Sequence, residues 1–345
     1  MSSKPGLQPS PTQPSSILGH SPSGRTPVDQ TPPACPTPLS GQRRAISAGP
    51  HGGDARRVAQ DLGLDPATVI DLSASLNPFA PDPTDIVRRH LDALHDYPNA
   101  DHATALLADA IGVSADRLVL TNGGAEAISL VAAHVQQGSV VEPDFSLYRR
   151  HLKTVDATAG RWRSNPASPL GTLAAPHDTA AVWDEAFYPI AAGTWTRGDE
   201  SWRLGSLTKL WSCPGLRLGY VIAPSAPDAT IIRTKQPRWS VNGLALAAMG
   251  DFLAVTDLPG WQASIAKLRV EFTQALEELH LYIEPSTANW VLIHGAPELR
   301  LPLALDGIVV RDCTSFGMPN TLRVALPKPH ELDRVLSAFS SHTSR

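Results

Sequence analysis

Short apolar stretches alternate with longer amphipathic ones from about His51 to the end of the chain. The amphipathic stretches carry apolar residues at helical spacing and predict helices over 54–64, 84–94, 103–111 and from about 125 to 136. The stretches between them predict strands over 69–72, 118–120, 139–141, 180–183, 203–206 and 218–222. Short strands separated by helices are typical of an α/β domain with a mainly parallel central sheet.

The C-terminal part of the pattern differs, because one long helix comes first and strands follow it. The helix is predicted over 261–280, strands over 290–294, 307–311 and 321–325, and a final helix closes the chain. This order indicates a smaller α+β domain, which we expect N-terminal residues to complete. The predicted organisation is a disordered arm over 1–48, a small domain built from 49–95 and 259–345, and a large domain over 96–258.

Residues 1–50 lack the alternating pattern and hold 11 of the 32 prolines, mixed with Ser, Thr, Gly and Gln. Such a composition buries too little apolar surface to offset the entropy of ordering the chain, so we expect a disordered arm. A plain linker is the favoured interpretation, and a regulatory phosphosite or a partner-binding arm is the alternative.

Composition argues against several classes of function. The formal net charge is -4 and no Lys/Arg block stands out, which disfavours binding to nucleic acid or to a membrane surface. No run of 18 or more apolar residues predicts a membrane span. Cys35, Cys213 and Cys313 are far apart and the histidines show no HExxH spacing, so neither a disulfide framework nor a metal site is indicated. A reducing cytoplasm fits this cysteine usage and the lack of a secretory-signal pattern.

Candidate chemistry begins at Gly123-Gly124-Ala125-Glu126, between a predicted strand and a predicted helix. Glycines let a ligand approach the backbone, and the start of a helix offers free N–H groups and the positive end of its dipole to an anion. This favours a phosphate cup, although a structural strand–helix turn explains the glycines equally well. The pattern is neither GxGxxG nor a Walker loop, which argues against a dinucleotide or a nucleoside triphosphate.

A carboxylate and a lysine follow two further predicted strands. Asp184 comes directly after the strand over 180–183, where parallel sheets bind ligands, although a helix cap or turn residue is the plainer interpretation. Lys209 lies between a strand and Leu, Trp, Cys and Pro, an unusual setting for a surface charge. A desolvated lysine near a cation has a lowered pKa and becomes an amine nucleophile. Arg217, eight residues on, and the hydroxyl of Ser206 are able to hold a phosphate.

The run from Ser206 to Tyr220, SLTKLWSCPGLRLGY, resembles the lysine motif of fold-type-I enzymes that use pyridoxal 5'-phosphate (PLP), aminotransferase class I/II. More narrowly, it resembles the branch of histidinol-phosphate aminotransferase and threonine-phosphate decarboxylase. The resemblance covers about residues 51–340 and implies a large PLP-binding domain with a smaller α+β domain. Five further motifs occur in that branch's order: His51-Gly52-Gly53, Ser75-Leu76-Asn77-Pro78, Tyr97-Pro98, Asn122-Gly123-Gly124 and Leu322-Arg323-Val324.

The resemblance implies a role for each matching residue. Lys209 would form the Schiff base with the cofactor and move protons at Cα, and Asp184 would pair with the pyridine nitrogen. Phe145 would stack on the ring, an ordinary core residue being the alternative. Asn77, Arg323 and His51 would meet the substrate, although a turn histidine explains His51 equally well. The residues implied to hold the cofactor phosphate are Gly124, Ala125, Ser206, Thr208, Arg217 and, from a neighbouring subunit, Tyr97, which implies a homodimer.

Two residues depart from the family's pattern. Ser168 stands where an Asn normally contacts the ring oxygen, and Phe187 stands where many aminotransferases have a Tyr that bonds the same oxygen. Losing both donors is expected to alter the pKa of the Schiff base and to weaken ring positioning, with Ser168 able to substitute through its hydroxyl. The lysine motif is intact, so the cofactor prediction stands.

The resemblance leaves the reaction open, because the same scaffold serves transamination and decarboxylation at Cα of an amino acid or amine, here expected to carry a phosphate. The wider motif set slightly favours an aminotransferase of histidinol-phosphate type. The His-Gly-Gly start favours the threonine-phosphate decarboxylase of cobalamin synthesis. One rival is a PLP-sensing transcriptional regulator, although the Pro-rich N-terminus lacks a helix-turn-helix pattern. A second rival is a cofactor-free scaffold, suggested by Ser168 and Phe187.

Overall fold

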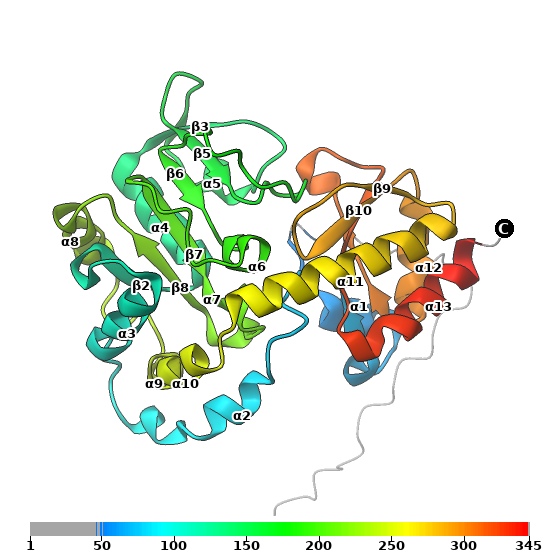
Figure 1. The fold of residues 1–345 in the computed structure, drawn as a ribbon, viewed down its shortest axis with the longest axis horizontal. Helices are drawn as coiled ribbons and strands as arrows, with labels where there is room; N and C mark the ends of the chain where they lie inside the picture. Colours follow the sequence, from blue (N-terminus) through cyan, green and yellow to red (C-terminus); the bar gives the residue numbers. More distant parts are fainter. Residues whose placement is uncertain (1–45, 47–48, 50, 344–345) are drawn as a thin grey trace, which may run out of the picture. The chain divides into compact units, whose positions relative to one another are not determined.

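The computed structural model describes residues 46, 49 and 51–343 (Figure 1). Apart from Ile46, the arm predicted over 1–48 lies outside the described residues. The described chain has a seven-stranded sheet, a four-stranded sheet and a two-stranded one, with helices between the strands, so the predicted α/β class is confirmed. Among these residues, no helix combines the length and the apolar composition that crossing a bilayer requires.

The large sheet has the strand order β2-β8-β7-β6-β5-β3-β4. Four of its six strand pairs are parallel, and only β8 runs antiparallel to both of its neighbours. The prediction of a mainly parallel sheet is therefore correct. Its strands are β2 (Leu118–Asn122), β3 (Gln137–Val140), β4 (Thr154–Val155), β5 (Arg161–Ser164), β6 (Val182–Asp184), β7 (Trp202–Ser206) and β8 (Leu218–Ile222).

Two apolar cores cover the two faces of this sheet, because successive residues of a strand point to opposite sides. In β2, Leu118 and Leu120 belong to one buried cluster and Val119 belongs to the other. The core around Val119 is closed by α4 (Gly123–Val135), α5 (Leu147–His151) and α8 (Ala226–Lys235). The opposite core is closed by α3 (Asp101–Ile111), α6 (Tyr188–Ala192), α7 (Leu207–Leu210), α9 (Gly243–Ala247), α10 (Met249–Ala254) and the long α11 (Leu258–Glu278).

A four-stranded antiparallel sheet in the order β12-β13-β10-β9 forms the centre of the smaller part. Helices α11 and α13 (Leu332–Thr343) bury their apolar residues against it. The N-terminal segment joins this part, since α1 (Ala55–Leu62) packs against α12 (Arg300–Leu305) and β1 (Ile70–Asp71) pairs with β11 (Ile308–Val309) (Figure 1). The sheet strands are β9 (Tyr282–Glu284), β10 (Trp290–His294), β12 (Arg311–Asp312) and β13 (Thr321–Ala325).

Two elements predicted as continuous are divided in the structure. The strand predicted over 307–311 becomes β11 and β12, because the chain leaves β1 at Val310 and pairs with β13 instead. The helix predicted over 84–94 becomes α2 (Pro83–Arg88) and a 3-10 helix (Leu91–His95). Between them, Arg89 and His90 both reach the carboxylate of Asp251, at 3.0 and 2.9 Å.

Candidate active site

The carboxyl ends of β2, β6 and β7 lie at one edge of the large sheet, where the antiparallel β8 begins. Asn122 at the end of β2 pairs with Leu218, and Ser206 at the end of β7 pairs with Gly219. Asp184 ends β6, next to β7. Ligands bind at such edges because the loops that follow parallel strands converge there.

A cup lined by glycine backbone lies between β2, β7 and β8. Gly123 begins α4 with φ of 75°, and a Cβ atom there would collide with the guanidinium of Arg217. A Cβ on Gly219 would lie 2.6 Å from the carbonyl carbon of Gly123 and 2.8 Å from the nitrogen of Gly124. An ideal Cβ on Gly124 would lie 3.6 Å from Cβ of Ser206. The start of α4, Ser206 and Arg217 therefore converge, and a helix start with an arginine and a hydroxyl suits a phosphate group.

Lys209 lies in α7, directly after β7. Its Nζ donates a hydrogen bond to the carbonyl oxygen of Ala74 at 2.9 Å and lies 5.7 Å from the centroid of the Phe187 ring. Burial lowers the pKa of Lys209 to about 8, and the nearby cations Arg323 and Arg217 act in the same direction. The lowered pKa increases the fraction of Lys209 that is in the neutral, nucleophilic form at physiological pH.

Asp184 receives one hydrogen bond on each carboxylate oxygen. The hydroxyl of Tyr148 donates to Oδ2 at 2.8 Å, and the backbone N–H of Ala186 donates to Oδ1 at 3.0 Å. Burial raises the pKa of Asp184, whereas these two hydrogen bonds lower it. Its orientation is therefore fixed, and a cation opposite it would favour the ionised form.

Two buried arginines lie side by side on adjacent strands of the small sheet. Arg323 on β13 and Arg311 on β12 are register partners, and both guanidinium groups lie against the Phe316 ring, at 5.9 and 4.6 Å. Burial lowers the pKa of Arg323 to about 9, and Arg311 contributes in the same direction. Nη2 of Arg323 donates to the carbonyl of Ser73, while its buried Nε has no hydrogen-bond partner among the residues described. Such a pair suits an anionic ligand.

Arg311 was missed by the sequence reasoning, which singled out only Arg323. The one available signal was its position at the end of an apolar stretch, 307–311, where a charged residue is unusual. Its pairing with Arg323 depends on the change of sheet at Val310, which the sequence pattern does not reveal.

The N-terminal histidine lies beside the residue expected to stack on the cofactor. The rings of His51 and Phe145 are 5.8 Å apart, tilted by 60°. Burial lowers the pKa of His51, and Arg311 and Arg150 lower it further, so the ring is neutral at pH 7. Its buried Nδ1 has no partner within the described part of the chain. His51 therefore lies beside Phe145 and close enough to Arg311 to feel its charge. Gly53 holds the His51 segment in place by donating its backbone N–H to the Ser73 hydroxyl at 2.9 Å.

Comparison with known proteins identifies the family. The family model for aminotransferase class I and II matches residues 162–339, slightly more than half of the chain. The chain belongs to the class I and II aminotransferases. The predicted family and its fold are therefore confirmed.

Curated relatives of the chain in this family catalyse two different reactions. Threonine-phosphate decarboxylase of Salmonella typhimurium is 29% identical over 84% of this chain and 95% of its own length. Histidinol-phosphate aminotransferase of Halorubrum lacusprofundi is 28% identical over 79% of this chain and 89% of its own length. The chain is thus an enzyme of a PLP-dependent family that includes transaminases and decarboxylases.

A solved structure supports the same fold. The histidinol-phosphate aminotransferase of Sinorhizobium meliloti, in complex with pyridoxal-5'-phosphate, matches with a TM-score of 0.73 at 15% identity, covering 87% of this chain and 95% of that one. At this identity, the match bears on the fold alone.

Two residues predicted by the class I and II resemblance have their side-chain polar groups engaged by neighbouring backbone, and a third is bonded through its own backbone. Asn77 donates through Nδ2 to the carbonyl of Leu210 at 2.9 Å and accepts from the N–H of Phe79 at 3.0 Å. The Thr208 hydroxyl donates to the carbonyl of Leu218 at 3.3 Å. Ser168 is buried, and its backbone N–H donates to the Ser164 hydroxyl at 2.7 Å. In the structure, Asn77 and Thr208 hold the lysine segment of this aminotransferase-family fold in place.

Tyr97 is a predicted site residue that is strongly exposed in the single chain. It is 79% exposed, and its ring lies against that of Trp239, with the centroids 4.8 Å apart and the planes tilted by 34°. Within the part of the single chain that the structure describes, Tyr97 makes no contact with Lys209, Asp184 or Arg217. Its predicted role from a neighbouring subunit stays a prediction.

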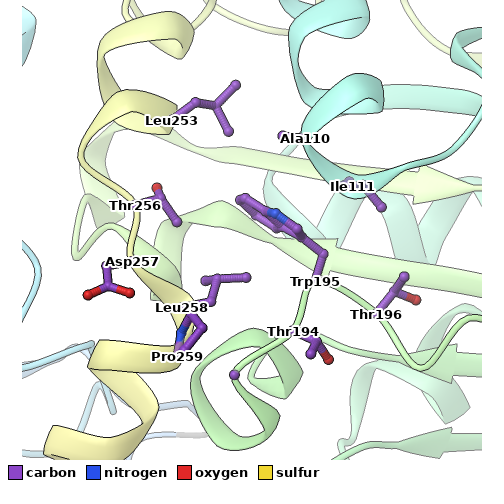
Figure 2. A pocket seen from close by; sticks show the side chains of 11 residues that line it. Ala110, Ile111, Thr194, Trp195, Thr196, Leu253, Thr256, Asp257, Leu258 and Pro259 are labelled. Carbon is purple, nitrogen blue, oxygen red and sulfur yellow. The ribbon is translucent and has the colours of Figure 1, made fainter.

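A separate hollow of about 520 Å³ lies between the end of α3 and the start of α11 (Figure 2). Trp195 projects into it between Leu253 and Ile111, and none of the predicted site residues lines it. Its volume alone would suggest a ligand-binding site in this aminotransferase-family protein. The chemistry is instead concentrated around Lys209.

Proposed function

We propose that the chain binds PLP and acts at Cα of an amino acid or amine that carries a phosphate. The observation that carries this proposal is the environment of Lys209: a partly buried amine with a pKa lowered to about 8, at a sheet edge that also presents Asp184 and the phosphate cup. Two further cations, Arg323 and Arg217, lower the pKa of this lysine, whereas a solvated surface lysine keeps its ordinary pKa.

The residues present fit this cofactor. Gly123 and Gly219 leave a cradle that a Cβ would fill, and Arg217 and Ser206 close it, so a phosphate would be held by Gly124 and Ala125 N–H groups and by these two side chains. Bound PLP supplies an aldehyde that condenses with amines and a ring that accepts electrons from Cα. Asp184 would face the ring nitrogen and hold its proton there.

The chain's own groups supply the remaining chemistry. With a pKa of about 8, roughly one Lys209 side chain in ten is neutral at pH 7 and able to take a proton from Cα, and the protonated amine is able to return one. Arg323 and Arg311 bind the anionic groups of the substrate, and the aromatic rings beside them exclude water. A neutral His51 donates or accepts one further hydrogen bond to the substrate.

Decarboxylation of a phosphorylated amino acid such as threonine phosphate is the reaction that we place first. The supporting observation is His51, which lies against Phe145 and has a buried nitrogen without a partner in the described residues, and this favours a His-Gly-Gly segment that faces the substrate. This reverses the slight preference drawn from the sequence. Transamination of histidinol-phosphate type is the second candidate, supported by relatives such as that of Halorubrum lacusprofundi.

The first test concerns the cofactor. Purified protein mixed with PLP should acquire an absorbance band near the visible edge, because the lysine adduct absorbs there. Lys209→Ala should lose the band, whereas Lys235→Ala, which removes a lysine on the distant α8, should keep it. A wild-type protein without the band would be a cofactor-free scaffold and would contradict the proposal.

The second test concerns the reaction. The loaded enzyme is incubated with threonine phosphate, and separately with histidinol phosphate and 2-oxoglutarate. Carbon dioxide release in the first assay supports decarboxylation, and glutamate formation in the second supports transamination. Turnover in neither assay would contradict both reactions while leaving the cofactor result intact.

A further inference from the structure

A buried group of three polar side chains lies directly behind Asp184. It consists of Tyr148 on α5, Ser164 at the end of β5 and Asp144 just before α5. Tyr148 is 0% exposed and the other two are 6% exposed. The Ser164 hydroxyl donates to Oδ1 of Asp144 at 2.5 Å, and Tyr148 donates to Asp184 at 2.8 Å. Burial of so many polar atoms is costly unless each has a partner, as these do.

This group touches all three residues expected to contact the cofactor ring. Tyr148 bonds Asp184, which would meet the ring nitrogen. Asp144 accepts the backbone N–H of Phe145 at 2.7 Å, the residue expected on the ring face. Ser164 accepts the backbone N–H of Ser168 at 2.7 Å, the residue expected at the ring oxygen.

The strand register explains why the group is rigid. Ser164 and Asp184 are direct partners on the parallel strands β5 and β6. Tyr148 packs against Trp162 two residues earlier on β5, with ring centroids 5.7 Å apart. Ser164 is therefore fixed by the sheet and Tyr148 by its packing against β5, while Asp144, in the loop before α5, is tied to the sheet by its hydrogen bond from Ser164.

We propose that Tyr148, Ser164 and Asp144 form a positioning unit that orients the ring-contacting residues, and that Tyr148 and Asp144 influence the charge of Asp184 in opposite directions. The inference rests on the proposed cofactor and adds residues that set its environment. None of the three is expected to touch a reacting atom, so they are positioning residues.

The opposite influences follow from charge. The hydrogen bond from Tyr148 favours the ionised form of Asp184 and lowers its pKa. Asp144 is a second buried acid: burial raises its pKa to about 6, and repulsion from Asp184 contributes in the same direction. Because this repulsion is mutual, ionised Asp144 disfavours the charge on Asp184. Among the described residues, the titratable groups beside the unit include Glu142, which accepts the backbone N–H of Asp144 at 3.0 Å, and His51, which faces Phe145.

The experiment uses two variants that change one group each. Tyr148→Phe removes only the hydroxyl, and Asp144→Asn removes the charge while keeping the shape. Tyr220→Phe is the matched control, since it removes an equally buried tyrosine hydroxyl that has no partner in the described residues. The readouts are the pH midpoint of the visible band of PLP-loaded protein and the dissociation constant for PLP.

Tyr148→Phe should move the pH midpoint of the visible band upward. Without the Tyr148 hydroxyl, Asp184 keeps its own proton more readily, and the ring then carries less positive charge. Asp144→Asn should move the midpoint downward, and Tyr220→Phe should leave it unchanged. Each shift should be roughly half a pH unit to one unit, as expected when one hydrogen bond to a charged group or one partly screened charge is removed. Shifts in the same direction, or a Tyr148→Phe midpoint equal to that of the control, would overturn the inference.

The inference is tested separately from the cofactor proposal by measuring the unloaded protein. Carbon-detected NMR of aspartate carboxyl groups should show the pKa of Asp184 rising in Tyr148→Phe and falling in Asp144→Asn. If wild-type protein fails to bind PLP, the proposed function fails, yet these two shifts still decide whether the unit acts on Asp184. An unchanged Asp184 in both folded variants overturns it.

Discussion

At the scale of single residues, the acidity of Lys209 is set by its neighbours. Burial is the main cause of its lowered pKa, and Arg323 is the strongest of the charges that add to it, ahead of Arg217. Arg323 lies on the small sheet and Lys209 on the large-domain helix α7. The same arginine is thus expected to serve two purposes, binding an anionic substrate and keeping the amine available for reaction.

Replacing Arg323 should make Lys209 harder to deprotonate. An amine condenses with an aldehyde only in its neutral form, so the rate of adduct formation with PLP should rise with pH up to about 8 and then level off in wild-type protein. Arg323→Met removes the cation and should shift this midpoint upward, slowing the reaction at pH 7 by several-fold. Stopped-flow absorbance across pH provides the measurement.

Arg323→Lys is the control for this shift, because it keeps a positive charge but not the forked geometry. It should leave the midpoint near that of wild type while weakening substrate binding. Equal midpoints in wild type and Arg323→Met would show that the charge of Arg323 does not reach Lys209.

At the scale of elements, β8 packs closely against the start of α4. It enters antiparallel between β2 and β7, and at Gly219 the strand comes so close to the start of α4 that a Cβ has no room. The shape of the phosphate cup therefore depends on the absence of a side chain at Gly219.

Gly219→Ala should disturb both stability and cofactor binding. The added methyl group would lie 2.6 to 2.8 Å from rigid backbone atoms of Gly123 and Gly124, and relieving this overlap costs about 1–3 kcal/mol of unfolding free energy. The displaced start of α4 should also weaken PLP binding. Thermal unfolding and titration of the visible band provide the two measurements.

Gly215→Ala is the matched control, since a Cβ at Gly215 meets nothing within 4 Å. It lies in the same lysine-motif segment and should leave both quantities close to wild type. Comparable losses in the two variants would mean that the segment is sensitive to any alanine and that the overlap at Gly219 is not the cause.

The elements also show where sequence patterns succeed and where they do not. Strands with two or more consecutive buried apolar residues, such as β2 and β8, were predicted from the sequence alone. The strand β5 was not, because Trp162 is its single apolar residue and its other positions read as polar loop. Ser164, which ends β5 and contacts Asp144, was overlooked for the same reason. Arg311 was overlooked because its partner is set by sheet pairing and not by spacing along the chain.

At the scale of the whole molecule, the site is assembled from both ends of the chain and its middle. His51, Lys209 and Arg323 are separated by more than a hundred residues each, and the order of the motifs, at plausible spacings, made the family recognisable. The sequence did not distinguish residues with free polar groups from those whose groups are already bonded. Asn77 illustrates this, since its amide is engaged by Leu210 and Phe79.

The exposed aromatic pair bears on how many chains make one site. Tyr97 and Trp239 are 79% and 58% exposed, and Leu94, three residues before Tyr97 in the chain, is 66% exposed. Large apolar side chains gathered on a surface are typical of an interface. We expect a homodimer in which Tyr97 of one protomer reaches the phosphate cup of the other.

A mixing experiment tests this arrangement. Lys209→Ala lacks the amine and Tyr97→Ala lacks the neighbouring contact, so each homodimer should be impaired in activity. If Tyr97 acts across the interface, a mixed dimer has one site with an intact Lys209 and an intact Tyr97 from the other protomer. Random exchange in an equal mixture should then restore about a quarter of the wild-type sites.

Tyr282→Ala provides the control, because Tyr282 is similarly exposed, at 68%, but lies on β9 of the small sheet. This variant should be active by itself. Sedimentation of the wild-type protein should give the mass of two chains. A single-chain mass with full cofactor affinity, or a mixture no more active than its parts, would place Tyr97 outside the neighbouring site, because only a residue contributed by the other protomer can complement Lys209→Ala in this way.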